Sequence, residues 1–497
     1  MILATGACSV VGAESADTED EVTIAISTLQ TLDPAFARGS GSDLSILSQI
    51  YSSLTTLQAD GSVGPGLATS WEQRDPRTWV FHLVKDAKFV NGAALDADVV
   101  AWNFDRMFDP NVKATANTGY ELLDKVTTEN PTTVVFTTKE PWLELPRRVT
   151  WTYLLEPEWA KAHNPKTEAM PSGPYKLVSY NMASDVVLER NDGYYGTKPA
   201  IEKVRYKVLP QSSSVIAGLK SGEVDVAYGL DPLDLNQVKG DPRLSVGSIG
   251  GATVSVLGFN TLAGKPTADQ RVRAAVNYAV DTAAIARSVL NGTVSPHSTQ
   301  LLSKPYDGFD DSLKPWPHDP DKARQLLKEA GYSGGLALTI GFTSERGDIA
   351  VTPTVQALAE QLKQVGIDLK LQTVSGSKWV DFLRDKQHAP DMAYLGFASQ
   401  SLSTIELLSQ RIETAPYTWG PVDDAYDDAV ARAKTAATPE ARQQAIGEAL
   451  RAAADDAALV WLWTQPRTYA VDKRLTAQDR HDSWVRATEL TWSGNGK

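Results

Sequence analysis

The sequence predicts an α/β protein of two or three domains, in which helices cover mixed β-sheets. The chain has 497 residues, more than a single hydrophobic core organises. A strand-like run at 204–208, a helix pattern at 212–221 that ends before Gly222, and a short apolar run at 224–227 form one β-α-β unit. Units of this kind build a sheet with helices packed on it.

The composition disfavours two classes of partner, nucleic acids and anionic membranes. The chain has 48 basic and 61 acidic residues and a net charge of −13, which disfavours binding to nucleic acid or to anionic membrane surfaces. Hydrophobic residues make up 42% and charged residues 22%, as in an ordinary globular protein. No run of 18 apolar residues occurs, so we expect no membrane-spanning helix.

The most informative stretch is 67–107, LATSWEQRDPRTWVFHLVKDAKFVNGAALDADVVAWNFDRM. Residues 78–83 alternate in the manner of a strand, with Trp79, Phe81 and Leu83 on one face. Asp96 then stands where it can cap a helix with an apolar stripe. The stretch contains no nucleophile set, metal cluster or phosphate loop. We therefore expect it to form part of the structural framework and not a catalytic site.

This stretch resembles the signature of the family 5 extracellular solute-binding proteins, the receptors of peptide, nickel and opine importers of the ABC type. The order of L-A-x-S-W, W-x-F-x-L, K-D, K-F, D-V-V and W-x-F is long and specific. The blocks PSGPY at 171–175 and VRAAVNYAVD at 272–281 resemble further blocks of the family. The resemblance implies a protein that works outside the cytoplasm, either on the cell surface or in the periplasm.

The same resemblance implies a periplasmic-binding-protein-like class II fold, with two mixed-sheet lobes joined by a hinge and an inserted extra domain. The hinge is expected at two crossings, near Val254 and Thr464. The expected segments are 1–20 for a lipoprotein signal remnant and tether, 21–55, 172–253 and 466–497 for domain I, 56–171 for domain II, and 254–465 for domain III.

Local signals predict individual elements in order along the chain. The expected strands are 21–26, 78–83, 132–137, 204–208, 254–260, 367–374, 392–397 and 460–471. The expected helices are 44–51 capped by Ser42 or Asp43, a pair over 269–290, 319–331 capped by Asp319, 352–365, 379–383, and 431–453 interrupted at 438–439.

The N-terminal residues predict a lipid anchor. Cys8 is the only cysteine, so no intramolecular disulfide can form. It follows LATGA, which resembles a lipoprotein cleavage motif with Thr5 in the place of the usual Leu. Residues 10–20 are small and polar, as in a flexible tether. We expect Cys8 to carry the lipid; the alternative is an incidental or buried cysteine.

The resemblance also implies a ligand cleft with contacts from three parts of the chain. Aromatic residues would stack on the solute or cover it, and arginines would hold a carboxylate or phosphate. The expected ligand-binding residues are Gln30 and Ser40 from the first lobe, Arg147, Arg148 and Trp151 from the middle segment, and Phe397, Gln400, Tyr417 and Trp419 from the third domain.

Gln400 is the most informative departure from the family. Peptide receptors of the family place at this position an Asp that pairs with the α-amino group of the peptide. A glutamine can accept a hydrogen bond but cannot neutralise an ammonium group. The sequence therefore disfavours a peptide with a free N-terminus as the solute.

No metal, cofactor or catalytic set is predicted. The six histidines are scattered, and none has the spacing of metal ligands. The acidic cluster near Asp319 fits no calcium loop and is explained by helix capping. No G-x-S-x-G motif occurs, and Pro266 follows Gly264-Lys265 where a phosphate loop needs Ser or Thr. We expect a binding protein and not an enzyme.

The expected function is the substrate-binding component of an ABC importer. The protein would be a monomer that captures a peptide-like, opine-like or oligosaccharide solute by hinge closure and delivers it to the transmembrane permease subunits. It would touch the membrane only through its anchor. Two alternatives stay open: a sensory or lectin-like receptor without a transport role, and a secreted hydrolase.

Overall fold

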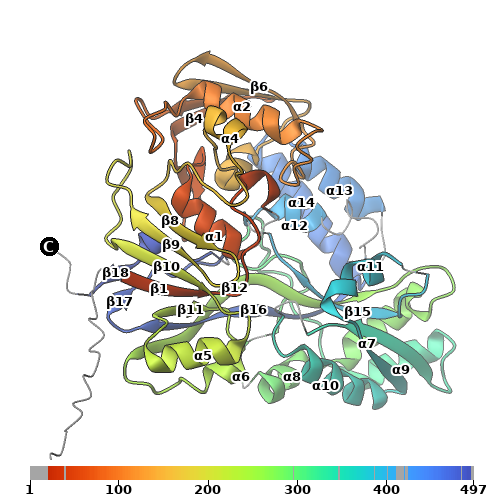
Figure 1. Ribbon diagram of the computed structural model, residues 1–497. Coiled ribbons are helices and arrows are strands. Elements are labelled where there is room, and N and C mark those ends of the chain that lie inside the picture. The colour runs from red at the N-terminus through yellow and green to blue at the C-terminus, as the bar shows by residue number, and fades with distance from the viewer. Residues whose placement is uncertain are drawn as a thin grey trace, which may run out of the picture.

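A computed structural model gives the fold of most of the chain (Figure 1). It describes residues 21–37, 41–290, 292–294, 296–344, 348–385, 387–399, 401–409, 419, 424–482 and 484–493. The predicted anchor Cys8 and its tether lie outside these residues, and so do Ser40, Gln400 and Tyr417. No helix among the described residues is long and apolar enough to cross a membrane.

A ten-stranded mixed sheet runs through most of the molecule, in the order β14-β13-β15-β12-β16-β11-β1-β10-β9-β8. Two long strands in the middle of this order, β12 and β16, connect its two halves (Figure 1). The strands are β1 Glu21–Ile26, β8 Tyr175–Asn181, β9 Asp185–Arg190, β10 Lys203–Val208, β11 Val226–Tyr228, β12 Leu244–Phe259, β13 Leu336–Phe342, β14 Ile367–Thr373, β15 Met392–Phe397 and β16 Leu459–Asp472.

The first lobe is formed by β1 and β8–β11 with helices on both faces. Val22 and Ile24 point to the core that includes α1, whereas Ala25 packs toward α5, so β1 is covered on both sides. The smaller elements of this lobe are α1 Gly41–Ile50, α5 Ser212–Ser221, α6 Pro232–Leu235, β17 Leu475–Thr476 and β18 Thr491–Trp492. Gly222 follows α5 with φ 80°, the left-handed conformation that the sequence predicted at this end.

One predicted cap in the first lobe is wrong. Ser42 and Asp43 lie inside α1 and do not precede it. The Asp43 carboxylate instead accepts a hydrogen bond from the backbone N–H of Gln30, at 2.9 Å, and so ties the loop after β1 to the helix. Sequence spacing could not show this contact, because the donor lies in a separate loop.

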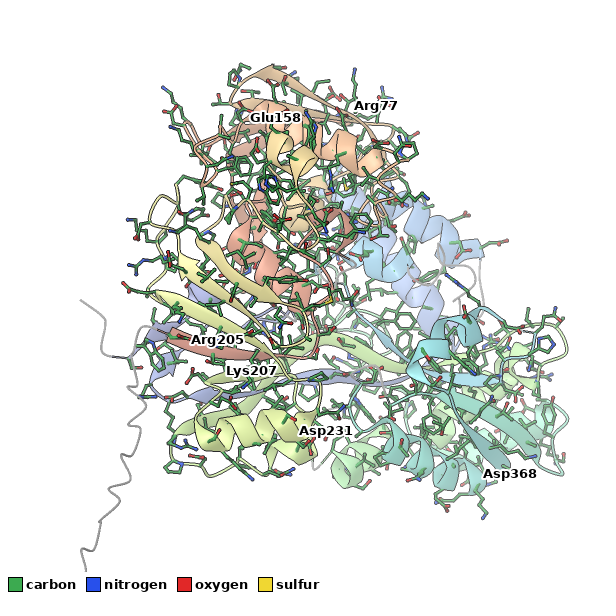
Figure 2. The ribbon with its side chains drawn as sticks, in the orientation of Figure 1. Arg77, Glu158, Arg205, Lys207, Asp231 and Asp368 are labelled. Atoms are coloured by element: carbon green, nitrogen blue, oxygen red, sulfur yellow. The ribbon has the colours of Figure 1, made fainter. Side chains whose placement is uncertain are left out.

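Ion pairs cover part of the outer surface of this lobe. Figure 2 labels Arg205 and Lys207 on β10. The Arg205 guanidinium pairs with Glu21 at 3.0 Å, and Lys203 pairs with the same carboxylate at 2.8 Å. Lys207 pairs with Glu223. Such exposed pairs contribute little to stability and mainly keep the surface hydrated.

An inserted body is built on a separate four-stranded antiparallel sheet, in the order β4-β5-β7-β6. The strand predicted at 78–83 is confirmed as β5, and Asp96 caps α2 through the N–H groups of Asp98 and Val99. The elements are β2 Thr55–Leu57, β3 Val63–Pro65, β4 Ala68–Asp75, β5 Thr78–Leu83, β6 Leu123–Asn130, β7 Thr133–Thr138, α2 Ala97–Phe108, α3 Leu145–Arg148 and α4 Pro157–Ala162.

The second lobe packs helices around β13–β15. Asp319 caps α9 as predicted, with Pro320 as its first residue. The pattern predicted at 431–453 is confirmed as two helices, because Thr438 caps the second of them before Pro439. The helices are α7 Gln270–Ala279, α8 Thr282–Val289, α9 Pro320–Glu329, α10 Val351–Lys363, α11 Trp379–Arg384, α12 Thr404–Ser409, α13 Asp424–Lys434 and α14 Pro439–Asp455.

The two lobes meet where the pairing of β12 with β16 is interrupted. The register runs from Leu244 opposite Asp472 to Gly250 opposite Pro466, and resumes with Val254 opposite Thr464. Three residues of β12 therefore face only Gln465, which makes a bulge at the crossings that the sequence predicted as the hinge. A Cβ atom at Gly251 would lie 2.3 Å from the Gln465 carbonyl oxygen, so this close approach requires glycine.

Candidate functional site: two cavities between the bodies

The larger cavity, of about 990 Å³, lies between the two lobes. The first lobe contributes the ends of β1 and β11 and the first turns of α1 and α5, and the second lobe contributes Ser344, Ile349, Ala398 and Ser399. The bulged crossing, with Gly251, forms part of the wall. A ligand in this cavity would touch both lobes and the strands that join them, so we call it the interlobe cavity.

Arg467 is the fixed cation of the interlobe cavity. Its guanidinium stacks on the ring of Tyr228, at 4.1 Å from the centroid. It donates hydrogen bonds to the backbone oxygens of Arg480, at 3.0 Å, and Trp484, at 2.6 Å. Burial lowers the pKa of the Arg467 guanidinium, but an arginine stays charged over the physiological range. Its position is therefore set by the protein before any ligand arrives.

The remaining lining mixes apolar side chains with small polar ones, and it includes the carboxylate of Asp482. Ser27, Ser42 and Gln211 from the first lobe face Ser399 from the second. The His481 ring nitrogen Nδ1 lies 2.8 Å from the Gly250 oxygen beside the bulge. Hydroxyl and amide groups can donate and accept hydrogen bonds, so this lining suits a polar solute more than an apolar one.

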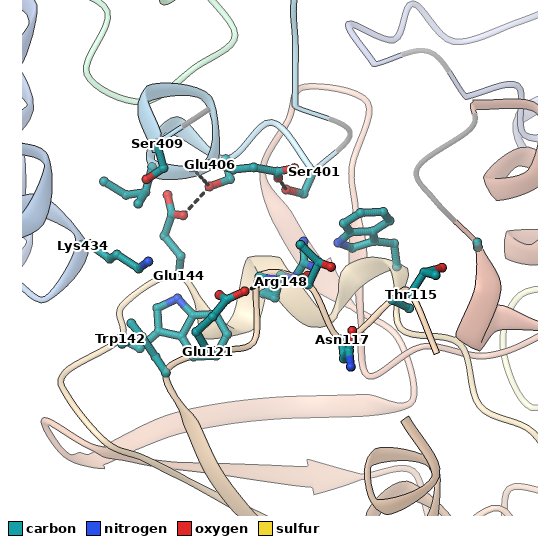
Figure 3. Close-up of a pocket in the computed structure, with 18 of the residues that line it drawn as sticks. Thr115, Asn117, Glu121, Trp142, Glu144, Arg148, Ser401, Glu406, Ser409 and Lys434 are labelled. Carbon is teal, nitrogen blue, oxygen red and sulfur yellow. Dashed lines mark hydrogen bonds between the residues drawn. The ribbon is translucent and has the colours of Figure 1, made fainter. Parts of the chain in front are cut away.

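A second cavity, of about 590 Å³, lies between the inserted body and the second lobe (Figure 3). We call it the outer cavity. Residues 114–122 and 142–151 form one side, and Ser401, Ser403 and Glu406 belong to the other. Its lining includes two tryptophan rings, Trp142 and Trp151, three glutamates and two cations, so it is more aromatic and more charged than the interlobe cavity.

Arg148 is held in the wall of the outer cavity by aromatic rings. Its guanidinium carbon lies 4.8 Å from the ring centroid of Tyr120 and 4.6 Å from that of Trp151. One terminal nitrogen donates to the backbone oxygen of Thr118. The Arg148 Nε atom is buried and has no hydrogen-bond partner among the described residues. Stacking orients this cation toward the cavity that Figure 3 shows.

The structure separates the residues that the sequence grouped into one cleft. Arg148 and Trp151 line the outer cavity. Arg147 instead donates to the backbone oxygens of Gly61, at 2.8 Å, and Ser401, at 3.0 Å. Gln30 is exposed beside α1 and is absent from the lining of both cavities.

Two of the three aromatic residues predicted in the second lobe are described, and neither is among the lining residues of the two cavities. Phe397 ends β15 and packs on the second-lobe core, next to Ala398, which does line the interlobe cavity. Trp419 is 1% exposed and packs inside that core, 6.5 Å from the ring of Phe382. The position of Trp419 does not fit a cleft residue, because its ring is enclosed by the core. Ser40, Gln400 and Tyr417 lie outside the described residues.

Sequence reasoning missed Arg467 and Tyr228. A signal was present, because Arg467 interrupts a strand that otherwise reads as buried and aromatic. A charge in such a strand is a candidate for a built-in ion or ligand contact. Its partner Tyr228 lies on another strand, and no spacing rule connects the two residues.

The described residues hold no group of three His, Cys, Asp or Glu side chains suited to a metal ion. The fold has two lobes, and the interlobe cavity lies beside the bulged strands that join them. Residues 62–413 match the model of the bacterial extracellular solute-binding proteins, family 5. The chain therefore belongs to this family, which confirms the family, the fold class and the extracytoplasmic location expected from the sequence.

Two relatives in Escherichia coli (strain K12) illustrate the range of the family. The chain is 31% identical to the nickel-binding periplasmic protein over 350 residues and 29% identical to the dipeptide-binding protein over 357 residues. Each alignment covers 65% of this chain and 66% of the relative, so the chain spans just under two thirds of their length.

Solved structures match over nearly the whole chain. CtaP from Listeria monocytogenes, an ABC transporter substrate-binding protein, has a TM-score of 0.85 at 21% identity, covering 95% of this chain and 99% of that one. NikA from Brucella suis, in complex with Fe(III)-EDTA, has a TM-score of 0.83 at 25% identity, with the same coverage. The first of these likenesses shows the fold alone.

Proposed function

We propose that this protein captures a small polar solute in the interlobe cavity and delivers it to the permease of an ABC importer. The observation that carries the proposal is a cavity lined by both lobes and by the two bulged strands that join them. Bending at the bulge changes the width of the cavity while the paired strands keep the lobes aligned. Ligand contacts on both sides then favour the closed form.

We propose a solute that carries at least one carboxylate or similar anionic group. Arg467 supports this, because its guanidinium is fixed in the wall before binding, and the carboxylate of Asp482, which also lines the cavity, is already paired with Arg480. Related proteins were solved with the peptide STSA, with Fe(III)-EDTA and with agropinic acid. An opine-like acid, a chelate or a blocked peptide agrees with the expected loss of ammonium recognition at Gln400.

Several further features belong to the same proposal. The protein would act as a monomer, would make or break no bond in its solute, and would be anchored through Cys8. The cores of the first lobe, the inserted body and the second lobe support the segments expected for domains I, II and III, except that Tyr153 and Leu155 pack in the first-lobe core and Leu57 in the second-lobe core.

A thermal-shift screen followed by calorimetry tests the proposal. The probes are opine-like acids, metal–EDTA chelates, peptides with free and blocked N-termini, and oligosaccharides. Ser27→Phe would place a ring in the interlobe cavity from an exposed position, and should abolish binding of the best probe. Ser179→Phe, on exposed edge strand β8, is the control and should bind normally.

Equal affinity in the two variants would refute the interlobe cavity as the binding site. Steady chemical turnover of a bound probe would favour the hydrolase alternative. Binding without any association with permease subunits in membranes that contain them would favour the sensory alternative.

A further inference from the structure

Four charged side chains meet where the inserted body touches the second lobe. Glu144 and Arg147 belong to the inserted body, and Asp307 and Arg442 to the second lobe. Arg442 pairs with Glu144, and it lies 3.9 Å from Asp307, which is 3.8 Å from Arg147. The side chains of Glu144 and Arg442 are each only 12% exposed. The cluster has two positive and two negative charges, so it is neutral as a set.

The cluster also holds three serines that separate the two cavities. The Ser403 hydroxyl donates to Glu144, and the Ser401 carbonyl oxygen accepts from Arg147 at 3.0 Å. The Ser399 hydroxyl accepts from the Ser403 backbone N–H at 3.0 Å and donates to Glu406 at 2.7 Å. Figure 3 shows Glu144 reaching toward the segment that carries Glu406 and Ser401.

These serines face different spaces. Ser399 lines the interlobe cavity, whereas Ser401 and Ser403 line the outer cavity. A hydrogen bond of 3.0 Å between Ser403 and Ser399 therefore connects the contact of the inserted body with the wall of the interlobe cavity. A shift of one side can be transmitted to the other through this bond. Among the described residues the two bodies share no β-sheet, so side-chain contacts rather than backbone pairing hold them together here.

We propose that Glu144 and Arg442 form a latch that holds the inserted body against the second lobe and fixes the serine wall of the interlobe cavity. Breaking one half of the latch leaves a nearly buried charge without its partner, which is more costly than removing both charges. The latch opens when the second lobe moves away from the inserted body. Water then hydrates both charges, so neither charge is left buried without a partner. The position of the second lobe is thereby tied to the inserted body as well as to the hinge.

The test measures hydrogen–deuterium exchange on the full chain with no solute added. Arg442→Gln and Glu144→Gln should each raise exchange about tenfold in α12 and α3, on the two sides of the latch. The double variant should return exchange toward that of the parent, because no unpaired charge remains. Arg432→Gln, which breaks the exposed pair of Arg432 with Glu448 on α13 and α14, is the matched control and should change neither helix.

Two results would overturn the latch. One is unchanged exchange in α12 and α3 of both single variants. The other is an equal rise in the central strands β12 and β16, which would mean general destabilisation and not local release. The double variant keeps the test specific, since a residue needed only for folding would not be rescued by removing its partner.

Discussion

The interlobe cavity and the outer cavity differ in what holds their two sides together and in the side chains that line them. Two strands that pair on both sides of a bulge cross behind the first, and its described lining combines apolar and small hydroxylated side chains with one fixed guanidinium. In the described part of the chain no strand is shared behind the outer cavity, and its lining includes aromatic and charged side chains. The strands behind the interlobe cavity therefore restrict the lobes to a hinge motion. The two sides of the outer cavity are held together by side-chain contacts, so we expect it to open when these contacts are lost.

Among the described residues, each cavity is lined by one arginine that stacks on an aromatic ring, and replacing these two arginines should have unequal effects. Arg467→Ala removes the donor that two buried backbone oxygens use. We expect a loss of about 3 kcal/mol in the free energy of unfolding. Urea denaturation followed by tryptophan fluorescence measures it. A loss below about 1 kcal/mol would show that this guanidinium is not part of the rigid wall.

Replacing Gly396 tests how rigid the second-lobe side of the interlobe cavity is. A Cβ atom there would lie 2.4 Å from the Asp348 carboxylate, which accepts a hydrogen bond from Gln465 at the bulge. Gly396→Ala should therefore destabilise the protein by about 2 kcal/mol. It should also speed hydrogen exchange next to Gln465. Gly334→Ala, with open space around it, is the control.

Asp43 makes the first lobe sensitive to pH. Burial raises the pKa of its carboxyl from 3.8 to about 6. The folded state then binds a proton more tightly than the unfolded state, so this group lowers the free energy of unfolding as pH rises from about 4 to 6.

Asp43→Asn should remove that pH-dependent penalty. The variant's advantage over the parent should grow between pH 4 and 6 and level off at about 3 kcal/mol at about pH 7. Denaturation at several pH values gives the difference. A constant difference across this range would contradict the raised pKa.

Arg148→Ala should have the smallest effect of the four. It removes two stacking contacts and a hydrogen bond at a cavity surface, and should cost about 1 kcal/mol or less. The same urea experiment measures it. A cost equal to that of Arg467→Ala would remove the contrast between the two cavities.

The sequence predicted elements best where the determining contact is local. Asp96 and Asp319 cap their helices through N–H groups two or three residues away, so a short pattern contains the whole interaction. The prediction that Asp43 caps α1 was wrong because its hydrogen-bond partner is Gln30, which lies in a different loop. Family resemblance supplied the fold, since the crossing of β12 and β16 depends on residues far apart in the chain.

The candidate site was predicted only in part for the same reason. Arg148 and Trp151 do line a cavity, but spacing could not show that it differs from the interlobe cavity. Trp419 shows a second limit, because composition does not distinguish a core aromatic side chain from one that faces a ligand. Arg467 and Tyr228 meet only after β11 and β16 have paired.

The place of β16 in the large sheet has a consequence for biosynthesis. This strand, Leu459–Asp472, pairs with both β12 and β11 although it comes late in the chain. Until it leaves the ribosome, β11 and β12 have an unpaired edge in the middle of the protein. A nascent or truncated chain that lacks β16 should therefore aggregate or need a chaperone, because the sheet cannot be completed until residue 472 of 497 has been synthesised.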